Sequence, residues 1–310
     1  MPRSVLINNT ADFHIHEMDT LGWELTVCNT LEPETSPARQ ILSRRGSFGC
    51  MLYDFLSELV PLHDVSSVLE VGGGYGFVMR DFLDKNPGLS ASMLDISPFL
   101  LQKQKDLLGG RGACFYEQDF LGADSNFLKQ YDLVLLNENI ADFPTACALT
   151  ADMLLGNGCD GDLSEIRRLV RTYGLSFKGE VFNFNFGAVK AVELLCSSGV
   201  PYVYLSEHSC ETEGPERYRE SLGVTPTGNP ERIALKGHDE YTIRFSHLEA
   251  VARHFNYRVL RGNYTDIFPV VFDEKVNFIL TSKTEKDEHE IIRLFISDLY
   301  KYEYLVLVKD

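Results

Sequence analysis

Two kinds of apolar pattern alternate along this chain, and together they predict an α/β protein. Continuous runs, such as VSSVLEV (65–71) and YDLVLL (131–136), are typical of parallel strands that are buried on both faces. Between such runs, apolar residues recur at helical spacing, as in the segment 49–61, where Pro61 ends the pattern. Strands that alternate with helices in this way indicate an open, doubly wound and mainly parallel sheet.

The same pattern assigns most of the chain to elements. We expect strands at 65–71, 92–95, 113–120, 131–136, 201–207, 257–260, 276–281 and 304–308. We expect helices at 49–61, 76–85, 98–108, 186–197, 246–255 and 285–300. Three additions are expected around and within a main domain at 48–310: an N-terminal arm at 1–47, a helical insertion at about 145–199, and a loop insertion at about 208–241.

A glycine-rich turn follows the first of these strands. Residues 70–76 read Glu-Val-Gly-Gly-Gly-Tyr-Gly. Glycines let the chain turn sharply and let a ligand lie against bare backbone, and the next helix directs its first N–H groups at that ligand. A dinucleotide-binding turn needs G-x-G-x-x-G, but Phe77 occupies the third glycine position, and no P-loop lysine is present. The turn therefore predicts a nucleotide-like ligand without the dinucleotide spacing.

Acidic residues stand at the ends of the next two strands. Asp95 is placed at the carboxyl end of the neighbouring strand, where a carboxylate can accept hydrogen bonds from both ribose hydroxyls of an adenosyl group. Ser97 can then cap the following helix, with Pro98 at its first position. Asp119 ends the next strand, at a position suited to an adenine amino group, and the backbone of Phe120 would face the ring. Either acid could instead be an ordinary strand-end residue.

The central strand brings a polar segment to the same edge of the sheet. The segment 137–144 reads NENIADFP, and ligands of open parallel sheets bind at the carboxyl ends of the strands. Glu138 is our candidate for handling the proton of a second reactant, although a carboxylate here could simply bond to backbone. Glu207, at the end of the strand 201–207, is a weaker candidate.

Three consecutive units and the last strand resemble one family. LEVGGGYGFVMRDFL looks like its nucleotide turn, LDISPFLLQKQKDLL resembles its second strand and helix, and LLNENIADFPT is similar to its Asn-Glu-Leu-Leu-Asp-Ala-Leu-Pro segment. The terminal KYEYLVLV resembles its final strand. The family is the MidA-like S-adenosylmethionine (SAM)-dependent methyltransferases, which include the mitochondrial complex I assembly arginine methyltransferase.

The resemblance implies a fold, a cofactor and a set of site residues. The fold is the class I methyltransferase fold, a Rossmann-like doubly wound sheet of seven mainly parallel strands. The cofactor is SAM, and a nitrogen or oxygen atom of a small molecule or a protein is the methyl acceptor. The residues implied in cofactor binding are Glu70, Gly72, Gly73, Gly74, Gly76, Asp95, Ile96, Ser97, Asp119, Phe120 and Asn137. The residues implied in catalysis are Asn137, Glu138 and Asp142.

One departure from the family concerns the acceptor side. The family segment has an aspartate three residues after its glutamate, where this chain has Ala141, and the acid is displaced to Asp142. This displacement keeps open an alternative class, a protein with the same fold that acts in assembly or scaffolding without transferase activity. A nicotinamide-dependent oxidoreductase is a distant third possibility, because the glycine spacing opposes it.

Composition narrows the partners. A net charge of −16 argues against nucleic acid or an anionic membrane as the main partner. Seven scattered cysteines without a C-x-x-C pair are typical of a reducing cytoplasm and predict neither disulfides nor a zinc site. No run suits a signal peptide or a membrane span. His14 and His16 alternate as in a half-exposed strand, and we predict no metal there because no third ligand stands nearby in the sequence.

Overall fold

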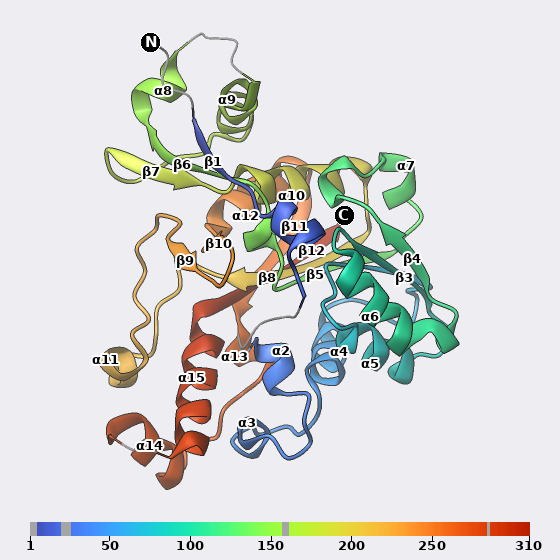
Figure 1. Cartoon of the computed structure of the whole chain (residues 1–310), viewed down its shortest axis with the longest axis vertical. Helices are drawn as coiled ribbons and strands as arrows, with labels where there is room; N and C mark the ends of the chain where they lie inside the picture. The colour runs from blue at the N-terminus through green and yellow to red at the C-terminus, as the bar shows by residue number, and fades with distance from the viewer. Residues whose placement is uncertain (1–4, 20–25, 157–160, 284–285) are drawn as a thin grey trace.

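A seven-stranded sheet forms the centre of the computed structural model, which describes residues 5–19, 26–156, 161–283 and 286–310 (Figure 1). The strand order is β11-β12-β8-β5-β2-β3-β4, and β12 alone runs antiparallel to its neighbours in this sheet. The strands are β2 (Ser67–Val71), β3 (Ser90–Asp95), β4 (Cys114–Glu117), β5 (Leu133–Asn137), β8 (Tyr202–His208), β11 (Tyr257–Asn263) and β12 (Tyr302–Lys309). The prediction of a doubly wound, mainly parallel sheet is confirmed.

Helices cover both faces of this sheet because its strands are apolar on both sides. Along β2, Val68 contributes to one apolar cluster while Leu69 and Val71 contribute to the other. The first cluster includes residues of α4 (Phe48–Leu59), α5 (Phe77–Lys85), α6 (Pro98–Leu108), α13 (Tyr264–Ile267) and α15 (Asp287–Lys301). The second includes residues of α9 (Gly161–Tyr173), α10 (Phe186–Ser198) and α12 (Phe245–His254). The glycine turn is thus anchored between two packed layers.

The segment 145–199 differs from the helical insertion expected from its sequence. It contains two strands, β6 (Thr145–Thr150) and β7 (Val181–Phe184), as well as α8 (Ala151–Leu155), α9 and α10. β6 pairs with β7 on one side and with the N-terminal β1 (Leu6–Asn8) on the other, and the three strands lie in the upper lobe of Figure 1. The partner of β6 in β1 lies more than a hundred residues away in the sequence, and such a partner leaves no signal in the local pattern. The sequence pattern therefore did not predict β6.

Two further predictions of secondary structure are wrong. The expected strand 276–281 is α14 (Glu274–Thr281), in which Val276, Ile279 and Leu280 are buried at helical spacing and Asp273 caps the first turn. The expected strand around His14 and His16 is α1 (Ala11–His16). A six-residue helix is too short for periodicity to separate it from a strand.

Short elements complete the chain. The segment 208–241 carries the 3-10 helix η4 (Glu216–Tyr218), α11 (Arg219–Leu222) and the hairpin of β9 (Arg232–Ala234) with β10 (Asp239–Tyr241). The remaining helices are α2 (Val27–Thr30), α3 (Pro37–Gln40), α7 (Ser125–Leu128), η1 (Gly109–Arg111), η2 (Phe120–Gly122) and η3 (Ile140–Asp142). Among the described residues, no helix combines the length and the apolar character that crossing a membrane requires.

Candidate active site

A cavity of about 210 Å³ lies at the carboxyl ends of the central strands. Its lining comes from three places: the glycine turn after β2, the ends of β3, β4 and β5, and the N-terminal segments 9–18 and 26–29. Most of the predicted site residues therefore meet at one place. Two do not face it, since Gly76 and Ser97 are absent from the lining.

Glycine is required at different positions of the turn for different structural reasons. Gly72 and Gly74 have φ values of 59° and 53°, which disfavour other residues, and both line the cavity. A Cβ on Gly72 would stand 2.5 Å from Nδ2 of Asn139, and one on Gly73 would stand 2.5 Å from the methyl group of Met93. Gly76, with φ 86°, precedes α5 as its N-cap. The turn thus presents backbone to the cavity and packs tightly behind it.

Glu70 is an acid in an apolar layer. It is 1% exposed, and burial raises its pKa to about 8, although a hydrogen bond from the backbone of Met79 in α5 opposes the shift. Its Oε2 has no hydrogen-bond partner among the residues that the structure describes. Because Glu70 lines the cavity, this oxygen lies beside the turn with its hydrogen-bonding capacity unused by the described residues.

Asp95 is held in a fixed orientation at the cavity wall. Oδ1 accepts from the backbone N–H of Ser97 at 2.9 Å, and Oδ2 accepts from Nε2 of Gln104 at 2.7 Å. Gln104 also donates to the carbonyl of Gly74, so one side chain connects the acid to the turn. Burial raises the pKa of Asp95 to about 6. Ser97 orients Asp95 and caps α6 from behind, which is why it does not face the cavity, whereas Ile96 does.

The end of β4 forms the outer rim. Asp119 is exposed and caps η2 by accepting from the backbone of Leu121. Phe120 is 2% exposed, and its ring lies nearly parallel to that of Phe143, with centroids 6.0 Å apart. Both residues line the cavity together with Asp119. The rim therefore combines aromatic faces with one exposed carboxylate.

Asn137 and Glu138 lie at the point where β5 ends. Oδ1 of Asn137 accepts from the hydroxyls of Ser206 and Tyr264, at 3.0 and 3.1 Å. The Tyr264 hydroxyl also lies 3.3 Å from Oε1 of Glu138. Glu138 has φ 53°, a conformation that costs about 1 kcal/mol or more for a residue with a side chain. Sequence reasoning missed Tyr264, which comes from a distant helix.

The environment of Glu138 favours its protonated form. Burial raises its pKa to about 8, the negative charge of Glu207 adds to the shift, and the Tyr264 hydrogen bond opposes it. Oε2 is buried, and no described residue makes a hydrogen bond to it. A carboxyl group in this state can exchange a proton near neutral pH, and a cation beside it would stabilise its charged form.

Asp142, the acid that is displaced by one residue from the position in the MidA-like segment, faces the cavity. Asp142 lines it from the end of η3, whereas Ala141 is buried behind it. Glu207 is also behind the lining, where it accepts from the backbone N–H groups of Ala141 and His208. Glu207 thus caps η3 and supports the segment that carries Asp142.

The N-terminal segment closes the cavity, and no local pattern in the sequence predicts this. The Thr10 hydroxyl donates to the carbonyl of Asp142, and Nε2 of His14 lies 2.8 Å from Oδ1 of the same residue. The hydrogen bond to Asp142 and its charge raise the pKa of His14 against the lowering effect of burial. We expected no third ligand near His14 from its neighbours in the sequence. In the structure this expectation is wrong, because Asp142 and His238, which are distant in the sequence, both approach His14.

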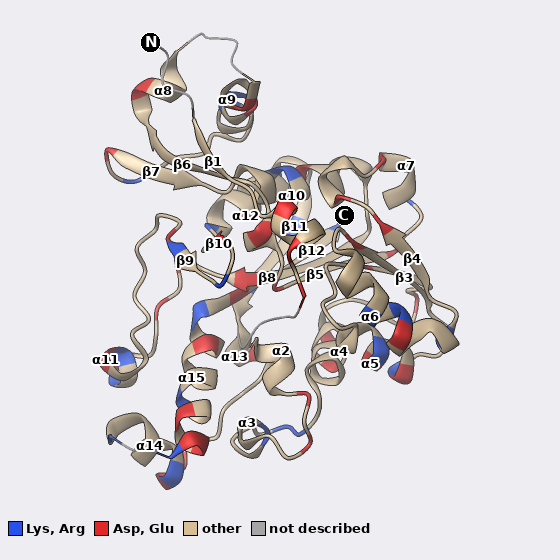
Figure 2. Ribbon diagram, viewed as in Figure 1, with Lys and Arg blue, Asp and Glu red and all other residues tan. Residues whose placement is uncertain are grey.

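Acidic side chains predominate over basic ones around the cavity. The described lining residues include five carboxyl side chains and neither lysine nor arginine. Figure 2 shows basic residues on outer helices such as α5, α11 and α14, while acidic residues are present at the centre of the view. Such a cavity is poorly suited to a ligand rich in phosphate and well suited to a cation.

The strand order and the position of the cavity define an α/β protein of the class I methyltransferase fold. No protein-family model and no curated protein matches the chain. An uncharacterized protein from Burkholderia thailandensis matches 96% of this chain and 86% of its own, with a TM-score of 0.55 and 11% identity. This likeness shows the fold alone.

Other solved structures are less similar. A phosphoethanolamine N-methyltransferase from Haemonchus contortus, in complex with phosphomonomethylethanolamine and S-adenosylhomocysteine, has a TM-score of 0.47 at 12% identity, over 98% of this chain and 67% of its own. A SAM-dependent methyltransferase from Clostridium acetobutylicum has a TM-score of 0.41 at 11% identity, over 84% of this chain and 91% of its own.

Proposed function

We propose that the protein is a SAM-dependent methyltransferase related to the MidA-like family. One observation carries the proposal: the glycine turn, Asp95 and the segment 137–142 line a single cavity at the carboxyl ends of the strands. The acidic lining supports SAM over a phosphate-bearing dinucleotide, because the sulfonium of SAM is a cation.

The residues present fit this cofactor. Gly72 and Gly74 offer bare backbone, Glu70 has a buried oxygen without a partner among the described residues, and Asp95 at the cavity wall would accept hydrogen bonds from the ribose hydroxyls. Asp119 would accept a hydrogen bond from the adenine amino group, and the backbone of Phe120 would face the adenine ring. When bound, SAM supplies an electrophilic methyl group, and the work of the protein is to position the acceptor and remove its proton.

Glu138 and Asp142 are the acceptor-side residues in this proposal. In its charged form Glu138 would take the proton from a nitrogen or oxygen acceptor, and because burial raises its pKa to about 8, that carboxylate is a stronger base than an ordinary one. Asn137 holds the Tyr264 hydroxyl beside Glu138 and so positions it. The acceptor is a small molecule or a protein, and we place the reaction in a reducing cytoplasm, without nucleic acid or membrane as partner.

The alternative, a scaffolding protein without activity, is favoured by Ala141 at the family's acid position. Two assays distinguish the methyltransferase from the scaffolding protein. The first is equilibrium dialysis with radiolabelled SAM, and the second measures release of S-adenosylhomocysteine in the presence of amine, guanidine and hydroxyl acceptors. Our proposal predicts saturable SAM binding, displacement by S-adenosylhomocysteine but not by NAD, and acceptor-dependent turnover. Binding without turnover for any acceptor would favour the scaffold, and absence of binding would refute both the cofactor and the reaction.

A further inference from the structure

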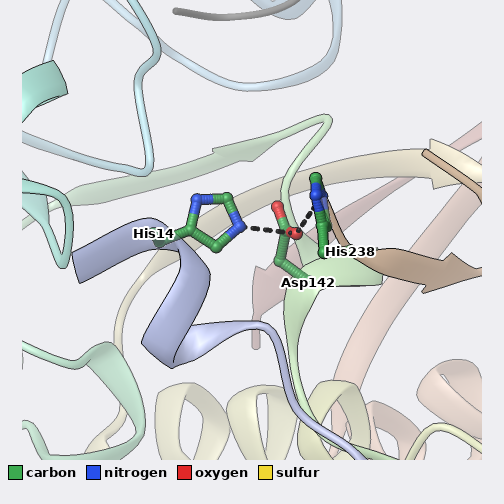
Figure 3. A group of neighbouring side chains, drawn as sticks. All are labelled: His14, Asp142 and His238. Atoms are coloured by element: carbon green, nitrogen blue, oxygen red, sulfur yellow. Dashed lines mark hydrogen bonds and ion pairs between the residues drawn. The ribbon is translucent and has the colours of Figure 1, made fainter. Parts of the chain in front are cut away.

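Two histidines and an aspartate from three distant segments converge at the edge of the cavity (Figure 3). His14 comes from α1, Asp142 from the end of η3, and His238 from the residue before β10. Nε2 of His14 lies 2.8 Å and Nε2 of His238 lies 3.7 Å from Oδ1 of Asp142. One donor atom from each residue lies within 4.8 Å of the other two. We call these three residues the His–Asp–His cluster.

We propose that the His–Asp–His cluster binds a divalent first-row transition metal ion. Imidazole nitrogen with carboxylate oxygen is a donor set that such ions prefer, and two histidines with one carboxylate leave coordination positions open. Metal–donor bonds of about 2.0–2.2 Å in tetrahedral geometry would put donor atoms roughly 3.3–3.6 Å apart. The two separations from Asp142 lie on either side of this range, so rotation of the side chains suffices to accommodate the ion.

The charge around the cluster also favours a cation. Glu240 lies with its Oε1 3.4 Å from Nε2 of His238, and its side chain is 20% exposed. Within the described part of the chain, the ion pairs of Asp142 and Glu240 are with histidines alone. Nδ1 of His238 is buried and has no hydrogen-bond partner in the described parts of the chain, so no structural bond there holds this nitrogen. Since neither carboxylate is paired with a lysine or arginine among the described residues, a metal ion would not have to displace a permanent cation from them.

The surroundings hold the donors in place. The ring of Phe13 stacks on that of His238, with centroids 4.3 Å apart, and Thr10 donates to the Asp142 carbonyl. Asn8 donates to the carbonyl of Asp239, next to His238. Support of this kind orients metal ligands and limits their rearrangement on binding.

His14 and Asp142 line the cavity, whereas His238 does not. Coordination positions left open by the cluster would therefore face the cavity. A metal there would hold an acceptor oxygen or nitrogen and lower its pKa, a role that rests on the proposed function. Binding of the metal itself does not depend on that function.

A titration of the chelator-treated, full-length protein with Co²⁺, followed by visible absorption, tests the site without any activity assay. We expect one equivalent of Co²⁺ to give ligand-field bands, and Zn²⁺ to abolish them. Asp142→Asn should weaken binding at least tenfold, because the amide keeps a contact with His14 but loses the charge. His238→Ala should weaken it at least a hundredfold.

The control is His16→Ala, which removes an exposed histidine from the same helix and should leave Co²⁺ binding unchanged. Thermal melts of all variants distinguish loss of a ligand from loss of the fold. Absence of saturable bands in the wild type would overturn the proposal and leave a structural ion-pair cluster. Equal affinity in wild type and Asp142→Asn would also overturn it. Since SAM binding is measured separately, failure of the metal site does not affect the proposed function.

Discussion

The two walls of the cavity are built in different ways. The turn wall, 70–77 with Asp95, comes from one β-α-β unit and presents mainly backbone, held between two apolar layers. The closing wall, 9–18, 26–29 and 137–144, comes from segments far apart in the chain and presents titratable side chains. Its parts are joined by polar contacts such as that between His14 and Asp142. We infer that the turn wall determines cofactor affinity and the closing wall determines the chemistry.

The largest expected loss of affinity from removing one polar side chain is on the turn wall. Asp95→Ala should weaken SAM binding by about a hundredfold or more, because hydrogen bonds to a buried charged group contribute about 1.5–3 kcal/mol each. Asp119→Ala is the matched control, since this exposed acid on the rim should cost less than about tenfold. Calorimetric titration with SAM measures both. Equal losses for the two variants would contradict the assignment of the ribose to Asp95.

The second prediction separates the walls. Glu138→Gln removes the proton acceptor but keeps the shape, so transfer should slow by about 10²–10³-fold while SAM affinity stays within about twofold. Tyr264→Phe removes only the hydroxyl beside Glu138 and should slow transfer less. Steady-state kinetics with an active acceptor, together with SAM titration, measure the effect. A large loss of SAM affinity in Glu138→Gln would mean that the two walls do not act separately.

The third prediction concerns pH. Burial raises the pKa of Glu70 from 4.5 to about 8, so between these values the folded protein keeps a proton that the unfolded chain loses. The free energy of unfolding should therefore fall as pH rises through this window, by at most about 1.4 kcal/mol per pH unit for this group. Glu70→Gln should make the dependence shallower. Urea unfolding at pH 5 and pH 8 measures it, and identical slopes for the two proteins would count against a buried, protonated Glu70.

The smallest expected effect concerns the ion pair of Arg80 and Glu32, which connects α5 to the chain just after the segment 26–29. Arg80 of α5 makes a two-pronged ion pair with Glu32, which follows the segment 26–29 of the closing wall. Arg80→Lys should lower the free energy of unfolding by about 1 kcal/mol, because lysine cannot make both hydrogen bonds. The exposed pair of Arg44 and Glu58, 3.6 Å apart, provides the control, and Arg44→Lys should change little. Thermal unfolding compares the two variants. Equal shifts of the unfolding temperature would show that the Arg80–Glu32 pair stabilises the fold no more than an exposed ion pair does.

The difference between the walls also explains what the sequence could predict. The turn wall is local, so strand periodicity and glycine spacing placed Gly72, Gly74 and Asp95 at one cavity. The closing wall depends on contacts across more than a hundred residues, such as His14 with Asp142, and local pattern carries no information on such pairs. Tyr264 and His238 were missed for the same reason. Ser97 shows a subtler limit, since a motif identified its position but not that it faces away from the cavity.

The central claim is that SAM lies against the turn wall. Gly74 lines the cavity with φ 53°, so Gly74→Val would place a branched side chain at a strained position beside the ligand. The most direct measurement is calorimetric titration of S-adenosylhomocysteine into wild type and Gly74→Val, with Gly110→Val as a control in open space. We predict one-to-one binding for wild type and Gly110→Val, and no binding for a Gly74→Val protein whose circular dichroism shows it to be folded. No heat from wild type, or wild-type binding by folded Gly74→Val, would contradict the claim.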